Sequence, residues 1–216
     1  MQPSFWHARW KDGQIGFHQD LVHPDLIKHQ DCFLGGTAQR VLVPLCGKSR
    51  DVAWLAAQGH DVVGVELSAI AAQALFDEAG HSPNISEQGA VQRWQSANIT
   101  VYVGDLFDVT DAQFGAVDRI WDRAALVALP AEMRRRYVAR LLSVLSPSGR
   151  ILLNCFQADW QRTGPPHSID LHELDALYAP MTHKRLLNAH DDMETNSKWR
   201  DYGATAFIVS TWLLSR

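Results

Sequence analysis

The chain lacks the features that mark secreted and membrane-spanning proteins. Its three cysteines are far apart and form no CxxC pair, which is typical of a reducing compartment rather than of a disulfide framework. No basic stretch followed by an apolar one opens the sequence, so we expect no secretory signal. The longest uncharged run, 202–215, is shorter than the roughly 20 residues that span a bilayer. We therefore expect a cytoplasmic protein with no membrane partner.

An excess of positive charge is also absent. The chain has 20 Lys and Arg against 24 Asp and Glu, a net charge of -4, so its overall charge does not attract a nucleic-acid backbone. The 10 histidines lack the spacing of metal ligands, and for His18, His23 and His29 a polar helix face is favoured over a zinc site. We expect neither a nucleic-acid partner nor a metal.

The glycine fingerprints of phosphate-binding loops are incomplete. Gly47-Lys48-Ser49 matches the end of a P-loop, but that loop needs a glycine at position 42, where the chain has Leu. No GxGxxG is present, which counts against the alternative of an NAD-dependent oxidoreductase. A single glycine suits a ligand without phosphate groups, because only a neutral group must approach the backbone.

Short apolar runs alternate with amphipathic segments along the chain. At roughly 100–200 residues per domain, the 216 residues predict one domain. Strands are predicted at 41–44, 61–66, 99–103, 119–121 and 150–156, and helices at 49–58, 68–79 and 133–145, while 81–98 is expected to be irregular. This order predicts a parallel sheet with helices on both faces, to which 206–214 adds a last strand that could pair antiparallel.

Three consecutive arginines, 134–136, fall within the predicted helix 133–145. They lie mostly off the apolar stripe that Met133, Tyr137 and Leu141 form at helical period. A solvated helix face is therefore expected here rather than an anion site.

The chemistry is expected where the predicted strands end, because ligands of open parallel sheets bind at that edge. Glu66 closes the second strand, 19 residues after Gly47, where such folds place a carboxylate that accepts hydrogen bonds from both hydroxyls of an adenosine ribose. A solvated strand-end carboxylate is the alternative. Asp105, after the third strand, could meet an adenine edge while Leu106 packs on its face. An adenosyl ligand without phosphates indicates S-adenosylmethionine.

Several strings of this sequence resemble the thiopurine S-methyltransferase family. The most specific are VPLCGKS at 43–49, GHDVVGVELS at 59–68 and IWDRAALVAL at 120–129. WHARWKDG at 6–13, FHQ at 17–19 and GPP at 164–166 also match, so the resemblance runs from about residue 6 to the C-terminus.

The resemblance implies an α/β fold of the Rossmann-like, class I methyltransferase type. It implies a seven-stranded, mostly parallel sheet with an antiparallel last strand, in a single domain, 1–216, with an N-terminal helical lid over 1–35 and a core over 36–216. It further implies an S-adenosylmethionine-dependent S-methyltransferase, with S-adenosylhomocysteine as product and an aromatic or heterocyclic thiol, such as a thiopurine, as substrate. Bacterial members are also associated with selenium and tellurium oxyanions, which stay open as alternative acceptors in metalloid detoxification. We expect a monomer.

The resemblance also assigns roles by position. The donor-binding residues it implies are Trp6, Trp10, Leu45, Gly47, Glu66, Asp105, Leu106 and Arg123. The acceptor side is assigned to Phe17, Arg123 and Lys198. The family has an arginine where Lys198 stands, with Arg200 nearby, and lysine lacks the planar fork of arginine.

A physical account supports two of these assignments. Aromatic faces such as Trp6, Trp10 and Phe17 can hold a positively charged sulfonium without offering a nucleophile, although the two tryptophans could equally be the buried stripe of a helix. Arg123 is the catalytic candidate, because a cation favours the thiolate form of the acceptor. Its alternative is a salt bridge to Asp122 or Glu132. A non-catalytic donor-binding protein would need a degenerate acceptor pocket, and the retained Phe17 and Arg123 argue against that.

Overall fold

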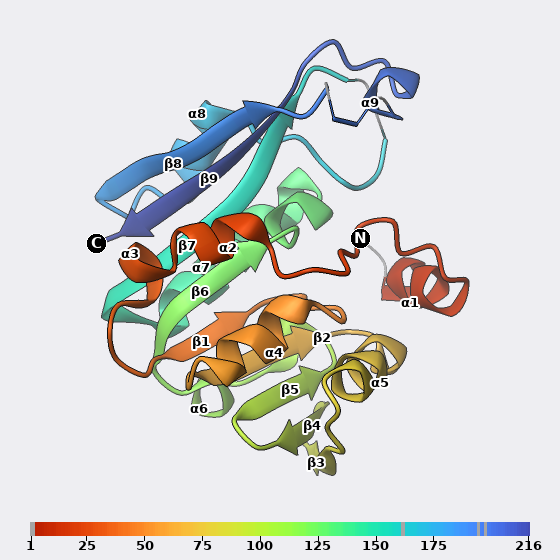
Figure 1. Ribbon diagram of the computed structural model, residues 1–216, viewed down its shortest axis with the longest axis vertical. Helices are drawn as coiled ribbons and strands as arrows, with labels where there is room; N and C mark the ends of the chain where they lie inside the picture. Colours follow the sequence, from red (N-terminus) through yellow and green to blue (C-terminus); the bar gives the residue numbers. More distant parts are fainter. Residues whose placement is uncertain (1–2, 161–162, 194, 197) are drawn as a thin grey trace.

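The computed structural model describes residues 3–160, 163–193, 195–196 and 198–216. In this part of the chain one nine-stranded sheet crosses the molecule, in the spatial order β3-β4-β5-β2-β1-β6-β7-β9-β8 (Figure 1). The strands are β1 (Arg40–Val43), β2 (Asp61–Glu66), β3 (Asn84–Gln88), β4 (Val91–Ser96), β5 (Ile99–Val103), β6 (Val117–Arg123), β7 (Leu145–Ala158), β8 (His183–Asp191) and β9 (Phe207–Ser215).

The centre of the sheet is parallel, as the alternating sequence pattern predicts. β1 pairs parallel with β2 and β6, β2 with β5, and β6 with β7. β9 pairs antiparallel with both β7 and β8, which confirms the antiparallel last strand. β1, β2 and β5 are buried almost throughout, because helices cover both faces, and this explains their continuous apolar runs.

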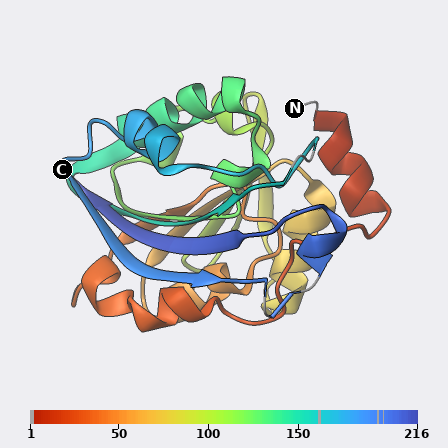
Figure 2. The ribbon, with the colours of Figure 1, turned by 90° about the horizontal axis from the view of Figure 1, so that it is seen from above.

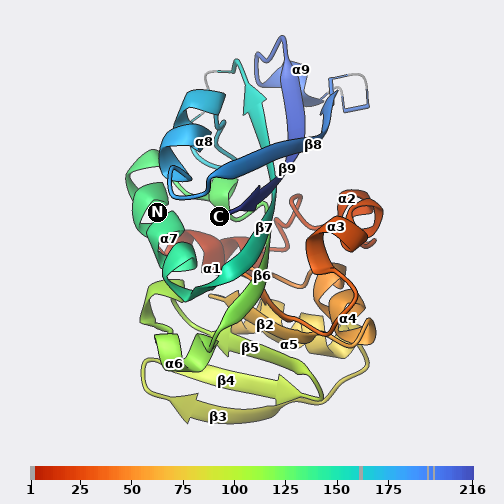
Figure 3. The same cartoon turned by 90° about the vertical axis from the view of Figure 1, so that its left-hand side faces the viewer.

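The sheet has nine strands, where seven were expected. The two additional strands, β3 and β4, form an antiparallel hairpin on the edge of β5, within the segment 81–98 that was expected to be irregular (Figure 3). β3 buries no residue, and β4 buries only Val91 and Trp94. Strands at a sheet edge face water, so they lack the apolar pattern by which buried strands are found. β8, at the opposite edge, is also without a buried residue and was not predicted individually.

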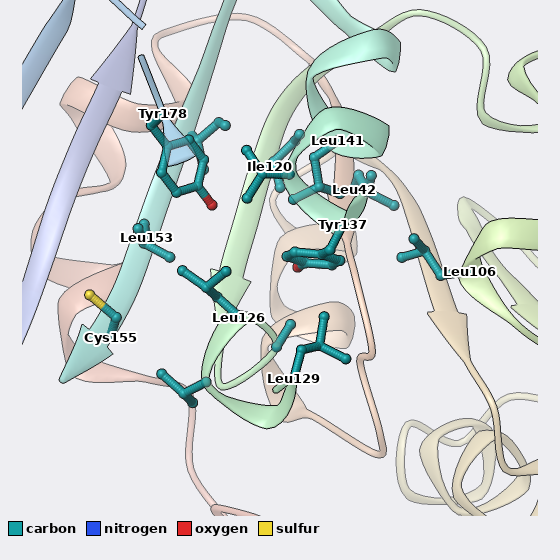
Figure 4. Close-up of a cluster of buried hydrophobic side chains, with 14 of the residues drawn as sticks. Leu42, Leu106, Ile120, Leu126, Leu129, Tyr137, Leu141, Leu153, Cys155 and Tyr178 are labelled. Carbon is teal, nitrogen blue, oxygen red and sulfur yellow. The ribbon is translucent and has the colours of Figure 1, made fainter. Parts of the chain in front are cut away.

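Helices cover both faces of the sheet (Figure 2). One apolar core joins the sheet to α2 (Pro24–Lys28), α3 (Gln30–Leu34), α4 (Arg50–Ala57) and α5 (Ala69–Glu78). The other, part of which is drawn in Figure 4, joins it to α6 (Asp111–Phe114), α7 (Ala131–Val144) and α8 (Leu171–Leu177). The shorter remaining elements are α1 (Pro3–Lys11), η1 (Leu106–Asp108), η2 (Leu126–Ala128) and α9 (Lys198–Asp201). In the described ranges, no helix combines the length and the apolar character that a membrane crossing requires.

The expected solvated face of α7 is wrong for one of its three arginines. Arg134 is only 3% exposed. Its guanidinium donates to both carboxylate oxygens of Glu173 on α8 at 2.6 Å and to the backbone oxygen of Leu129 at 2.9 Å. α8, a distant segment of the sequence, covers this position, so a pattern within α7 alone does not reveal the burial.

Candidate active site

A cavity of about 510 Å³ opens where the parallel strands β1, β2, β5 and β6 end. Figure 1 shows α1 beside this end of the sheet. All ten residues that the sequence assigned to the site line the cavity: Trp6, Trp10, Phe17, Leu45, Gly47, Glu66, Asp105, Leu106, Arg123 and Lys198. Arg200 is not among the lining residues. The volume lies in the range of small-molecule sites, roughly 300–1,000 Å³.

The turn after β1 presents its backbone to the cavity. Leu45 and Gly47 both adopt left-handed conformations, with φ of 48° and 54°. A Cβ atom at Gly47 would lie 3.1 Å from Cζ2 of Trp10, so only glycine lets this turn and the indole ring approach so closely. The turn is fixed from β2, because the Cys46 N–H donates to the Val65 oxygen at 2.9 Å.

Glu66 joins this turn to the start of α5. Its two carboxylate oxygens accept the Gly47 N–H at 2.8 Å and the Ser68 N–H at 2.7 Å. The side chain is buried, and burial raises the pKa of Glu66 to about 7, while the two backbone hydrogen bonds oppose that rise. The structure therefore places this carboxyl in the cavity wall, and not in solvent as the alternative would have it.

Asp105 and Leu106 form the wall beside β5. The Asp105 carboxylate accepts the Phe107 N–H at 3.0 Å and so caps η1. Leu106 is buried in the core beneath the cavity. The Gly104 N–H donates to the Glu66 oxygen at 2.9 Å, which ties this wall to the end of β2.

Three aromatic rings close the cavity on the side of α1. The Phe17 ring lies 5.8 Å from that of Trp6 and 5.6 Å from that of Trp10, edge to face in both pairs. Trp10 is buried, whereas Phe17 is 37% exposed although it lines the cavity. The rings thus pack together and at the same time offer aromatic surface to a ligand.

Arg123 ends β6 and is followed by Ala124, which has a φ of 64°. Burial lowers the pKa of Arg123, and the Asp51 carboxylate opposes that effect. Within the described residues no carboxylate forms an ion pair with Arg123. Asp122, the alternative partner, instead accepts the Tyr137 O–H at 2.9 Å and the Leu126 N–H at 3.1 Å. The cavity therefore contains a guanidinium whose donors are available to a ligand.

Lys198 and Trp199 border the opposite end of the cavity. The Lys198 ammonium lies 4.4 Å from the centre of the Trp199 ring. That ring stacks on Phe207 at 4.3 Å, and its N–H donates to Asp192 at 2.8 Å. A second cation and a second aromatic face thus lie across the cavity from α1.

The structure adds three cavity residues that sequence reasoning missed: His18, Asp51 and Trp121. His18 was expected on a polar helix face, but it lies in a loop and its side chain is only 9% exposed. Burial, then Lys48, lowers its pKa, so the ring is neutral near pH 7. The match FHQ at 17–19 pointed to this segment, but no local pattern marks Asp51 or Trp121 as part of a site.

The cavity fits an adenosyl donor in its own geometry. It offers a buried carboxyl at the end of β2, a closely packed glycine turn, and aromatic surface at its mouth. It lacks the glycine set of a pyrophosphate cradle.

Solved structures share this fold. The 1,6-didemethyltoxoflavin-N1-methyltransferase of Burkholderia thailandensis, solved with bound S-adenosylhomocysteine, superposes with a TM-score of 0.66 at 17% identity, covering 99% of this chain and 87% of that one. An arsenic(III) S-adenosylmethionine methyltransferase from Chlamydomonas reinhardtii gives a TM-score of 0.59 at 18% identity, covering 82% of this chain and 64% of that one. The fold is that of the class I S-adenosylmethionine-dependent methyltransferases.

Sequence comparison defines the family. The family model "Thiopurine S-methyltransferase (TPMT)" matches residues 1–216. Proteins named thiopurine S-methyltransferase from Azotobacter vinelandii and Nitrosospira multiformis are 42% and 39% identical, over 100% and 99% of this chain and 100% and 98% of theirs. The chain belongs to the thiopurine S-methyltransferase family and is an S-adenosylmethionine-dependent methyltransferase. The predicted fold class, enzyme class and methyl donor are confirmed.

Proposed function

We propose that the chain transfers a methyl group to the sulfur of an aromatic or heterocyclic thiol, thiopurines included. The observation that carries the proposal is Arg123, a largely buried guanidinium in the cavity wall that has no ion-pair partner among the described residues. A cation in such surroundings favours the anionic form of a bound thiol. The names of the relatives agree with an acceptor of this kind.

Chain residues at the end of the sheet would hold the methyl donor. When bound, S-adenosylmethionine supplies a methyl group on a positively charged sulfur. Trp6, Trp10 and Phe17 would face that charge with their rings, which attract cations and offer no competing nucleophile. Glu66 would accept hydrogen bonds from the ribose hydroxyls.

Further wall residues would complete the donor site. Asp105 and Leu106 would border the adenine, and Leu45 and Gly47 would expose backbone to the donor.

The acceptor would lie between Arg123, Phe17 and Lys198. Heterocyclic thiols ionise readily, so the main contributions of the chain are orientation of the sulfur and exclusion of water, with no strong base required. Arg123 would hold the thiolate, and the aromatic surface would hold the ring. Lys198 replaces a planar fork by a point charge, which favours anionic acceptors without fixing their plane.

The test is methyl transfer from labelled S-adenosylmethionine to 6-mercaptopurine by the wild type and two variants. Arg123→Ala should lose about 100-fold or more in kcat/KM and keep its donor affinity, because a charge-assisted contact to the acceptor is lost. Glu66→Ala should lose donor binding and with it activity. Arg185→Ala, an exposed arginine of β8 outside the cavity, is the control and should behave as wild type.

Two results would contradict the proposal. One is a wild type that binds the donor tightly but methylates no aromatic or heterocyclic thiol. Selenite and tellurite would then be tested as acceptors, since an oxyanion can also pair with Arg123. The other is an Arg123→Ala variant whose turnover equals that of the control.

A further inference from the structure

A buried carboxylate outside the predicted site, that of Asp51, lies in the cavity wall. Asp51 occupies the first turn of α4 and is 3% exposed. Its Oδ1 accepts the backbone N–H of His23 at 2.8 Å, and its Oδ2 accepts the indole N–H of Trp121 at 2.7 Å. Its own N–H donates to the Ser49 hydroxyl at 3.2 Å. The N-terminal segment, the start of α4 and strand β6 thus fix the carboxylate together.

This carboxylate is close to Arg123 but does not pair with it. Trp121 and Arg123 are two residues apart on β6, so they share one face of the sheet, whereas Asp122 between them faces Tyr137. Asp51 and Arg123 both line the cavity, and the Asp51 charge raises the pKa of Arg123 against the effect of burial. Among the described residues, however, their side chains form no contact within 4.0 Å. Each oxygen of Asp51 already has a neutral donor.

The groups around Asp51 do not neutralise it. The His23 ring packs on Trp121 with ring centres 5.4 Å apart. Burial, then the Arg123 charge, lowers the pKa of His23, so this ring is neutral at pH 7. Asp25, the next acid along the chain, accepts hydrogen bonds from Asn188 and Thr211 on the far side of His23. Asp51 is therefore the counter-charge of Arg123 in this wall.

We propose that Asp51 is a positioning residue, which His23 and Trp121 hold apart from Arg123 so that the guanidinium is balanced in charge but keeps its N–H donors free for the anionic acceptor. A direct Asp51–Arg123 ion pair would have to break before a thiolate could bind. The inference rests on the proposed acceptor role of Arg123.

The decisive variant is Trp121→Phe, which removes one of the two donors and keeps an aromatic ring. The freed oxygen should turn to Arg123, so the Kd of 6-mercaptopurine in the presence of S-adenosylhomocysteine should rise by about tenfold, while the Kd of S-adenosylhomocysteine stays within about twofold of wild type. Trp94→Phe is the matched control. It removes a buried indole hydrogen bond, to Gln92 at 3.1 Å, at a position outside the cavity.

Removing the charge of Asp51 should reverse the effect. In the double variant Trp121→Phe/Asp51→Asn no carboxylate remains to capture Arg123, and affinity for 6-mercaptopurine should return toward that of wild type. Asp51→Asn alone should bind this thiol at least as tightly as wild type, because the guanidinium then lacks its counter-charge. A merely structural role predicts losses in both variants, and such losses would overturn the proposal. Trp121→Phe behaving like Trp94→Phe would also overturn it.

A crystal structure of Trp121→Phe with S-adenosylhomocysteine separates this inference from the identity of the acceptor. An Asp51 oxygen within 4.0 Å of the Arg123 guanidinium is expected. Absence of that contact contradicts the positioning role even if thiols are substrates. Its presence supports the role even if the wild type binds no thiol, in which case the thiol assignment alone is wrong.

Discussion

At the scale of single residues, Glu66 couples the donor site to pH. Its pKa is about 7 in the folded chain, above its ordinary value of 4.5, because burial disfavours the charged form. A raised carboxyl pKa contributes stability that is fully present below pH 4.5 and is lost as the pH rises through 7. The ionised form, which is the better acceptor for ribose hydroxyls, is thus favoured by a bound donor and disfavoured without one.

Donor affinity should therefore increase with pH across neutrality. Between pH 6 and pH 8 the Kd of S-adenosylhomocysteine should fall by about tenfold, with release of a proton on binding near pH 7. Calorimetry in buffers of different ionisation enthalpy measures both quantities.

Glu66→Gln should bind more weakly and show neither effect. His18 has a pKa below its ordinary 6.5, so it titrates mostly below this range. A pH-independent wild-type Kd would refute the assignment of Glu66.

At the scale of elements, α1 is joined to the sheet through the close packing of Trp10 on Gly47. Few other features hold this helix, whose only buried residue is Trp10. The expected lid role of the N-terminal segment therefore concerns α1, since Leu26 of α2 and Phe33 of α3 lie in the core beside the sheet. The contact with Gly47 makes the position of the aromatic wall depend on the turn after β1.

Gly47→Ala tests this coupling. A Cβ atom 3.1 Å from Trp10 should displace the indole and weaken S-adenosylhomocysteine binding by roughly tenfold, and the left-handed backbone should cost about 1–2 kcal/mol of stability. Gly59→Ala is the control, because Gly59 also has a positive φ, 87°, but nothing within 4 Å of a Cβ atom. Calorimetry and urea unfolding compare the two variants. Equal donor affinities would show that Trp10 does not form the donor site.

At the scale of the whole molecule, donor binding should draw the N-terminal segment, the sheet and α9 together. At a free S-adenosylhomocysteine concentration of 100 times its Kd, linkage adds about 2.7 kcal/mol of stability. For a chain of this size that corresponds to a rise in Tm of about 5–10 °C.

Thermal unfolding measures this shift, and NAD at the same concentration serves as the control ligand and should give none. Hydrogen exchange should show new protection in α1 and unchanged exchange in β3 at the far edge of the sheet. A shift with NAD, or α1 amides that exchange equally fast with and without ligand, would contradict this picture.

Much of the fold and most of the site could be predicted from the sequence, for a common reason. β1, β2 and β5 are buried on both faces, so their apolar runs record their place in the sheet. Gly47, Glu66 and Asp105 follow such runs directly, and local order along the chain brings them to one edge. β3 and β8 were missed because exposed edge strands carry no such record.

By itself, the sequence determined the alternation of strands and helices, the donor class and the family, since each is written in contiguous residues. Only the tertiary structure decided the extra hairpin at the sheet edge, the burial of Arg134 by α8, and the network that joins Asp51 to His23 and Trp121. Partners in that network are 28 and 70 residues apart. Contacts over such separations depend on how the elements pack, and no local pattern encodes them.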